Sequence, residues 1–375
     1  MNIKSEIADL RSDSGRSGSG SSLNAVKTHV RELRPYTLNP CQTGVKLNQN
    51  ENPWDAPLEI KRETLRRVAD RAWSRYPEFV PRPLHERLAH FSGWKTEGIL
   101  AGNGSNELIQ ALLMVTIEGG KRVIINEPTF ALYRQVTTLL GGEVISVPLT
   151  PDLNYDSIAL AEAVASVDPA VVIICSPNNP TGCVLEPKAL AALLESFRGL
   201  VVVDEAYFEF SGLTVVPLLD QYSNLVVLRT FSKAMALAGL RIGYLLAAPE
   251  LVQEIGKALL PYNLNIISQT AAEVAIEMHG SMLQPLVRAI CNERDRLQDE
   301  LKQIAGLIPV PSRANFMLVR SSLDPRIVFR ELLRRDILVR DVSGYPLLEK
   351  YFRISVGTPE ENDLLLAALR EITLK

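Results

Sequence analysis

One lysine in this sequence is well placed for covalent chemistry. Lys233 lies in TFSKAMALAGLRIG, residues 230–243, at the end of a predicted strand. A lysine amine beside hydroxyl groups can form an imine with an aldehyde cofactor. Thr230, Ser232 and Arg241 could together hold a phosphate dianion, because an arginine offers two parallel hydrogen bonds. The Ser-Lys dipeptide alone is typical of a solvated loop, whereas the 14-residue segment is far more specific.

Two further polar segments follow predicted strands. Asp204 in DEAY ends a Val-rich run, where a buried carboxylate is costly unless it is paired. A protonated pyridine nitrogen would be a useful partner, because the charged ring stays an electron sink. Tyr207 could then hydrogen-bond a ring hydroxyl, although Asp204 could instead cap the following turn. Asn179 in SPNNPTG could offer its amide to the same hydroxyl, or it could belong to a tight turn.

A glycine-containing segment, GNGSNE, precedes a predicted helix. Exposed N–H groups at a helix start bind phosphate through their geometry and the helix dipole. Gly104, Ser105 and Asn106 are therefore candidates for a phosphate loop. An ordinary loop is the alternative, since a Gly-x-Gly pattern by itself is weakly specific. Phe130 in EPTFALY follows another strand and could stack on a flat ring, or it could pack in the core.

The elements that must position these residues alternate β-rich runs with helical patterns. Continuous Val, Ile and Leu runs are typical of strands buried on both faces. Their alternation with helices predicts an α/β domain with a mostly parallel sheet. Ligands of such sheets bind beyond the carboxyl ends of the strands, which is where the candidate residues fall. The β-rich runs cover residues 122–128, 170–182, 200–210, 225–233 and 241–248.

A second, smaller α+β domain is predicted in the C-terminal part. The chain has 375 residues, a length that suits two domains. A long helical pattern over roughly 281–305 opens the second domain. We therefore expect a large cofactor-binding domain at 46–280 and a small domain at 281–375, which residues 23–45 join. The N-terminal segment 1–22 ends in a Ser/Gly-rich stretch and is expected to be disordered.

Bulk composition limits the function further. The formal net charge is −3, so no overall basic field favours nucleic acid or a membrane surface. The longest apolar runs are too short to cross a bilayer. The four cysteines form no C-x-x-C pair, and only four histidines could share a metal. We therefore expect no metal site, no disulfide framework and a cytoplasmic protein with reduced thiols.

Taken in chain order, these segments resemble the fold-type I pyridoxal-phosphate enzymes, and within them the class I and II aminotransferases. The order is GNGSNE, PTF, PNNPTG, DEAY, TFSKAMALAGLRIG and FRISVG, and the resemblance spans about residues 34–370. It implies that Lys233 holds pyridoxal 5′-phosphate as a Schiff base. It also implies a homodimer in which Tyr76 reaches the cofactor phosphate of the neighbouring subunit. The implied catalytic residues are Lys233, Asp204 and Tyr207. The implied cofactor-binding residues are Tyr76, Gly104, Ser105, Asn106, Phe130, Asn179, Asp204, Tyr207, Thr230, Ser232, Lys233 and Arg241.

Finer features resemble the histidinol-phosphate aminotransferases. They are RPY (34–36), LNQNENP (47–53), RYPE (75–78), LRTFSKAMALAGLRIGY (228–244), SRANFML (312–318) and ILVRD (337–341). This resemblance implies transfer of an amino group between L-histidinol phosphate and 2-oxoglutarate. Arg353 in FRISVG would bind a carboxylate. Arg340, 13 residues earlier, and Tyr36 would bind the substrate phosphate, and Asn179 would also face the substrate.

Three departures from that family leave the exact substrate open. TLNP at 37–40 stands where a glycine is usual, Asn106 occupies a position that is often acidic, and the Ser/Gly-rich N-terminus is not typical. An aromatic amino-acid aminotransferase is one alternative, because a carboxylated substrate needs only Arg353. A threonine-phosphate decarboxylase shares the fold, the lysine and a phosphate-bearing substrate. A pyridoxal-phosphate-sensing transcription regulator would need a DNA-binding domain, and the roughly 45 residues before the body show no basic helix-turn-helix.

Overall fold

The computed structural model of the chain describes residues 22–33 and 43–374. It divides the chain into two units, 1–37 and 38–375. Most of the N-terminal segment expected to be disordered lies outside the described residues, and so does the candidate substrate residue Tyr36. The described elements of the first unit are η1 (Ser22–Ala25) and α2 (Thr28–Glu32).

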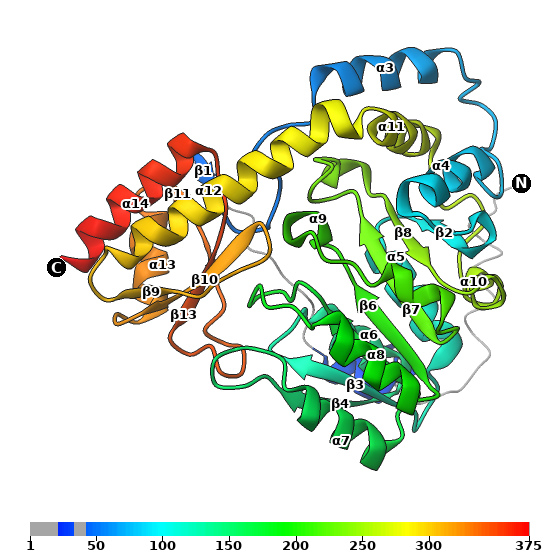
Figure 1. Cartoon of the computed structure of the whole chain (residues 1–375), viewed down its shortest axis with the longest axis horizontal. Helices are drawn as coiled ribbons and strands as arrows, with labels where there is room; N and C mark the ends of the chain where they lie inside the picture. Colours follow the sequence, from blue (N-terminus) through cyan, green and yellow to red (C-terminus); the bar gives the residue numbers. More distant parts are fainter. Residues whose placement is uncertain (1–21, 34–42, 375) are drawn as a thin grey trace, which may run out of the picture. The chain divides into compact units, whose positions relative to one another are not determined.

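The largest sheet of the second unit has seven strands (Figure 1). They are β2 (Ile99–Gly102), β3 (Arg122–Glu127), β4 (Glu143–Pro148), β5 (Val171–Cys175), β6 (Leu200–Asp204), β7 (Leu225–Thr230) and β8 (Gly243–Leu246). Their order is β2-β8-β7-β6-β5-β3-β4, and every neighbouring pair is parallel except the two that include β8. The predicted α/β class with a mostly parallel sheet is therefore confirmed, although the sequence does not indicate the reversed direction of β8.

Helices pack on both faces of this sheet, because the central strands are apolar on both sides. They are α4 (Arg82–Ser92), α5 (Ser105–Thr116), α6 (Leu132–Leu140), α7 (Ser157–Val167), α8 (Pro187–Ser196), α10 (Pro249–Gly256) and α11 (Ile266–Glu277). α3 (Leu58–Ala69) packs against α11. One core cluster gathers apolar side chains of α4, α7, α8 and α11, and the other gathers those of α5, α6 and α10. Shorter elements are η2 (Thr96–Gly98), α9 (Phe208–Ser211), η3 (Val216–Asp220), η4 (Ala238–Leu240) and η5 (His279–Leu283).

A four-stranded antiparallel sheet lies in the C-terminal part, with the order β12-β13-β10-β9. Its elements are β9 (Leu307–Pro309), β10 (Phe316–Ser321), β12 (Arg340–Asp341), β13 (Tyr351–Ser355), α12 (Gln284–Lys302), α13 (Pro325–Leu333) and α14 (Pro359–Thr373). The three helices pack with the sheet around a separate core cluster. Thr358 and Glu361 start α14 with a reciprocal capping box, which satisfies two free N–H groups of its first turn.

A short N-terminal strand joins this C-terminal part. β1 (Val45–Lys46) pairs in parallel with β11 (Ile337–Leu338). The next residue, Leu47, accepts a hydrogen bond at its carbonyl from the backbone of Ser355, with an N···O distance of 2.9 Å. These contacts fix the path of the segment after β1. The domain boundary between residues 280 and 281 stays a prediction.

The carboxyl ends of β5, β6 and β7 meet at one edge of the large sheet. Cys175 at the end of β5 is the register partner of Asp204 at the end of β6, and Asp204 pairs with Leu228 in β7. Asn179 follows β5 and Lys233 follows β7. The parallel pairing therefore brings residues from three distant segments to the same edge, as the sequence predicts.

The described helices include none long and apolar enough to cross a membrane. The same residues contain no group of three or more His, Cys, Asp or Glu side chains that could hold a metal ion. Cys175, Cys183 and Cys291 are free thiols.

Candidate active site

Lys233 is partly buried in the loop that follows β7. Its Nζ donates a hydrogen bond to the carbonyl of Gln49 at 2.9 Å and lies 6.0 Å from the ring centroid of Tyr207. Burial and the charge of Arg353 lower the pKa of Lys233 to about 8, against an opposing effect from Glu51. A lysine with such a pKa is about one-tenth neutral at pH 7, far more than an ordinary lysine, so its amine can act as a nucleophile and as a base.

Asp204 is a buried carboxylate, with 3% of its surface exposed. Its Oδ2 accepts a hydrogen bond from the hydroxyl of Tyr133 at 2.6 Å, and its Oδ1 accepts one from the backbone N–H of Ala206 at 3.1 Å. Burial raises the pKa of Asp204 to about 6, although both hydrogen bonds act in the opposite direction. Among the described side chains, none forms an ion pair with this carboxylate. A protonated ring nitrogen would supply the missing cation.

Three side chains of the 230–243 loop form a hydrogen-bonded cluster. Thr230 Oγ1 lies 3.0 Å from Ser232 Oγ, and Arg241 Nη1 donates to Ser232 Oγ at 3.2 Å. Hydroxyl and guanidinium groups gathered in this way can hold a phosphate dianion. The structure thus brings together the three phosphate candidates of this segment.

The start of α5 lies against the same cluster. Gly104 precedes α5 with a φ of +83°, and a Cβ atom added there would lie 2.6 Å from Arg241 Nη2. A side chain at this position would therefore collide with the guanidinium. Ser105 is buried and Asn106 is exposed, and the backbone N–H groups of both residues belong to the first turn of α5. The helix N-terminus and Arg241 together form a cradle that fits a phosphate.

The residues expected around a flat ring also lie at this edge. Phe130 is partly buried and packs edge-on against Tyr133, with ring centroids 5.6 Å apart. The hydroxyl of Tyr207 accepts a hydrogen bond from Asn50 Nδ2 at 3.1 Å, and burial raises the pKa of Tyr207. Asn179 Oδ1 accepts from Arg353 Nη1 at 2.5 Å, which leaves the Asn179 amide N–H groups to donate elsewhere. Tyr207 and Asn179 could therefore both hydrogen-bond a ring hydroxyl.

Arg353 and Arg340 lie on adjacent strands of the C-terminal sheet. Arg353 is buried and donates from Nη1 to Asn179 and from Nη2 to the carbonyl of Asn48 at 2.7 Å. Arg340 is its direct register partner across the antiparallel pair of β12 and β13. Within the described residues, Arg340 makes no ion pair with Asp341 or any other carboxylate, so a surface ion pair does not explain its position.

Tyr76 lies apart from this cluster. Its side chain is 81% exposed and stacks on Tyr262, with ring centroids 4.6 Å apart. No hydrogen bond from Tyr76 to the phosphate cradle appears among the described residues. This placement is compatible with a role at a neighbouring subunit, which stays a prediction.

The segment 48–52 contributes contacts that the sequence alone does not indicate. The carbonyl of Gln49 accepts a hydrogen bond from Lys233, and the carbonyl of Asn48 accepts one from Arg353. Asn52 Nδ2 donates to the carbonyl of Lys233 at 3.3 Å. The only sequence signal is the motif LNQNENP, which carries three asparagines without saying what they bind. Tyr133, three residues after Phe130, is a second residue that the sequence does not indicate, and it contacts the site by donating a hydrogen bond to Asp204.

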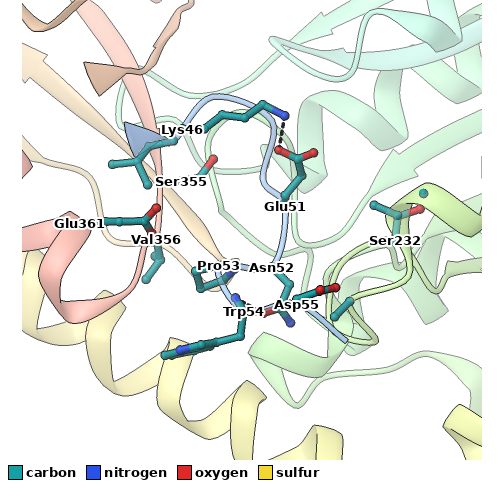
Figure 2. Close-up of a pocket in the computed structure, with 14 residues that line it drawn as sticks. Lys46, Glu51, Asn52, Pro53, Trp54, Asp55, Ser232, Ser355, Val356 and Glu361 are labelled. Carbon is teal, nitrogen blue, oxygen red and sulfur yellow. Dashed lines mark hydrogen bonds and ion pairs between the residues drawn. The ribbon is translucent and has the colours of Figure 1, made fainter. Parts of the chain in front are cut away.

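A pocket of about 340 Å³ adjoins the lysine loop (Figure 2). Its walls come from residues 46–55, 232–239 and 355–361. An ion pair between Lys46 and Glu51, with an N···O distance of 2.7 Å, spans one side of it. The volume lies within the range of small-molecule sites. Asn52 and Ser232 line this pocket and connect it to the residues around Lys233.

Comparison with known proteins identifies the family. The model of the family "Aminotransferase class I and II" matches residues 42–369. A histidinol-phosphate aminotransferase from Chlorobium phaeobacteroides is 39% identical over 343 residues, which cover 91% of this chain and 95% of the relative. The chain therefore belongs to the class I and II aminotransferase family. As a member of it, the chain is a pyridoxal-phosphate-dependent aminotransferase.

Solved structures agree with this assignment. A histidinol-phosphate aminotransferase from Sinorhizobium meliloti, in complex with pyridoxal 5′-phosphate, superimposes with a TM-score of 0.86 at 26% identity. The match covers 94% of this chain and 99% of that one. An L-threonine-O-3-phosphate decarboxylase from Porphyromonas gingivalis has a TM-score of 0.76 at 24% identity, over 88% of this chain and all of that one. That second likeness shows the fold alone.

The residues described above fit pyridoxal phosphate. Asp204 is a buried anion without a cationic partner among the described residues, as a protonated pyridine nitrogen requires. Gly104 leaves space beside Arg241 that a Cβ atom would fill. Lys233 has a lowered pKa and lies close to Tyr207.

Proposed function

We propose that this aminotransferase transfers an amino group between L-histidinol phosphate and 2-oxoglutarate, with imidazole-acetol phosphate and glutamate as products. The observation that carries the proposal is the pairing of Arg340 with Arg353 on one face of the C-terminal sheet. The name of the relatives that share 37–39% of their residues with this chain supports the same substrate. It would make the enzyme part of histidine biosynthesis.

The two half-reactions place different demands on the two arginines. Glutamate and 2-oxoglutarate carry a carboxylate next to the reacting carbon, which Arg353 can bind through two parallel hydrogen bonds. Histidinol phosphate has no carboxylate, so its phosphate needs cations in the same pocket. Arg340 supplies a second guanidinium on the face that Arg353 occupies, because directly opposed residues of an antiparallel pair project from the same side of a sheet. Tyr36 is the proposed third contact.

The chain's own groups have distinct proposed roles in the transfer. Pyridoxal phosphate supplies an electron sink and carries the amino group between substrates. With the cofactor bound, the Lys233 amine would accept a proton from the substrate carbon as a general base and would donate it again as a general acid. Asp204 keeps the ring nitrogen protonated, and Tyr207 and Asn179 orient the ring through its hydroxyl. The cradle at Arg241 and α5 anchors the phosphate.

We also propose a homodimer with active sites at the subunit interface. Trp73, Tyr76, Phe79 and Val80 are all more than half exposed, as is Leu260. A concentration of exposed apolar side chains is typical of a protein interface. In the dimer, Tyr76 would reach the cofactor phosphate of the neighbouring subunit. A cytoplasmic location stays a prediction from the sequence.

A comparison of different amino donors is the most direct test of the proposed substrate. Purified enzyme would be assayed with 2-oxoglutarate and, in turn, histidinol phosphate, phenylalanine and tyrosine, with coupled detection of glutamate. The proposal requires histidinol phosphate to have the highest kcat/KM. A preference for phenylalanine or tyrosine would favour the aromatic aminotransferase. Release of carbon dioxide from threonine phosphate would instead identify a decarboxylase.

A further inference from the structure

Asn50 is a buried residue whose backbone and side chain are both committed to specific contacts. Only 1% of its surface is exposed, and its φ is +53°. Asparagine is among the few residues other than glycine that adopt this left-handed region readily. The segment around Asn50 is neither helix nor strand, so its side-chain contacts define its conformation.

Three segments far away in the chain satisfy the polar groups of Asn50. Its backbone N–H donates to Ser355 Oγ at 2.8 Å, and its Oδ1 accepts from Ser355 Oγ at 3.1 Å. Its carbonyl accepts from Asn315 Nδ2 at 3.0 Å, and its own Nδ2 donates to the hydroxyl of Tyr207 at 3.1 Å. In this arrangement the single hydrogen of Ser355 Oγ goes to Asn50 Oδ1, and the amide nitrogen of Asn50 faces Tyr207.

The direction of the bond to Tyr207 has a chemical consequence. An amide nitrogen can only donate, so the hydroxyl of Tyr207 must accept from Asn50. The hydrogen of that hydroxyl is then available to another acceptor. Because burial also raises the pKa of Tyr207, the phenol keeps its hydrogen at neutral pH. The residue is thereby held as a donor.

We propose that Asn50 is a positioning residue that makes the hydroxyl of Tyr207 a hydrogen-bond donor to the ring oxygen of the cofactor. The inference rests on the role proposed above for Tyr207. It does not depend on the identity of the amino donor, so a failed substrate assay would leave it standing.

Two substitutions at this position separate the proposal from a purely structural role. Asn50→Asp keeps the shape, the left-handed backbone and both contacts with Ser355, but turns the donor into an acceptor that captures the hydrogen of Tyr207. Asn50→Gly keeps the backbone conformation and loses every side-chain contact, yet leaves the hydroxyl free to donate. A structural role therefore predicts that Gly is the more harmful change, whereas our proposal predicts that Asp is.

The measurement is equilibrium binding of pyridoxamine 5′-phosphate to the cofactor-free protein, because this form makes no covalent link to Lys233. We expect Asn50→Asp to weaken binding about 10-fold or more, and Asn50→Gly to weaken it less. Thermal melting of the same cofactor-free samples should give the opposite order, with Gly the less stable variant. If Asp bound the probe as well as Gly or better, the proposal would be wrong.

A double-mutant cycle with Tyr207→Phe removes the effect of the added charge. Without the hydroxyl there is no hydrogen to capture, so Asn50→Asp should change the affinity by less than about twofold in the Tyr207→Phe background. An equal loss in both backgrounds would show that the introduced carboxylate acts through its charge or through the fold, and would overturn the proposal. Should Asn50→Asp fail to fold, Asn50→Gly provides the same cycle: its loss of affinity must also depend on the presence of the hydroxyl.

Discussion

Arg340 and Arg353 face each other directly across the antiparallel strands β12 and β13. Like charges in such a position repel and destabilise a strand pair unless an anion lies between them or near them. Arg353 donates to the oxygens of Asn179 and Asn48, whereas Arg340 has no carboxylate partner among the described residues. An anionic ligand bound near the pair, such as the phosphate of the proposed substrate, would relieve this repulsion.

Arg340→Ala should distinguish a phosphorylated donor from a carboxylated one. Losing one charge-assisted contact to a desolvated phosphate costs roughly 2–4 kcal/mol, or about 30- to 1000-fold in kcat/KM. We expect that loss with histidinol phosphate and a much smaller one with any aromatic amino acid that the enzyme accepts. Steady-state kinetics with both donors measure it. Arg334→Ala, which removes an exposed arginine elsewhere in the same part of the chain, is the matched control. Equal losses for both donors would contradict a phosphate role.

Lys233→Ala should abolish nearly all transamination. The amine is the proposed base and the proposed point of covalent attachment of the cofactor. Borohydride reduction of the loaded protein, followed by mass spectrometry of its peptides, should find the modified lysine in the wild type and none in the variant. Full activity in Lys233→Ala would contradict the role of Lys233 as the base and as the attachment point of the cofactor.

Asp204→Asn should retain some cofactor and lose most of the rate. The amide cannot hold a positive charge on the ring nitrogen as a carboxylate does, and removing such a preorganised partner costs on the order of 100-fold in kcat. Tyr133→Phe is a milder variant for comparison, because it removes only a hydrogen bond that lowers the pKa of Asp204. We expect a smaller loss of rate there. Unchanged turnover in Asp204→Asn would remove this residue from the site.

The lowered pKa of Lys233 should be visible in the stability of the cofactor-free protein. The pKa is about 8 in the folded state, against an ordinary value of 10.5, so between these pH values the unfolded chain binds more protons than the folded one. The free energy of unfolding then rises with pH across that window. We expect the wild type to gain stability relative to Lys233→Met between pH 8 and pH 10.5. Denaturant unfolding at several pH values tests this, and a constant difference between the two proteins would contradict it.

Mixed dimers can test whether Tyr76 acts across the subunit interface. Tyr76→Ala and Lys233→Ala would first be shown to be impaired separately. In a heterodimer of the two, one site would combine the intact Lys233 of one subunit with the intact Tyr76 of the other. We expect activity to return after equal amounts of the two variants exchange subunits, toward about a quarter of the wild-type value, because half of the dimers become heterodimers and each of these has one intact site. No recovery despite exchange, or an active monomer in light scattering, would place Tyr76 outside the neighbouring site.

The sequence indicates the candidate catalytic residues, but it does not indicate the long-range contacts that position them. Asp204 and Lys233 can be picked out because continuous apolar runs mark their strands, and because ligands gather beyond the carboxyl ends of parallel strands. The spacing of Arg340 and Arg353 is visible in the sequence, but their register is not, since it depends on how β12 pairs with β13. Asn50 and Tyr207 are 157 residues apart, so nothing local indicates their contact. The direction of β8 is likewise set by packing rather than by local pattern.

Asn48 and Gln49 contact the arginine and the lysine of the site through their main chain. The carbonyls of Asn48 and Gln49 contact Arg353 and Lys233 whatever side chains those two positions carry. Substitutions at position 49 should therefore be tolerated more easily than a change in the number of residues. β1 fixes the start of the segment by its register with β11, so deleting one residue would move every carbonyl out of place at once. For the carbonyl contacts of these two positions, the length of the segment is a stricter requirement than the identity of the side chains.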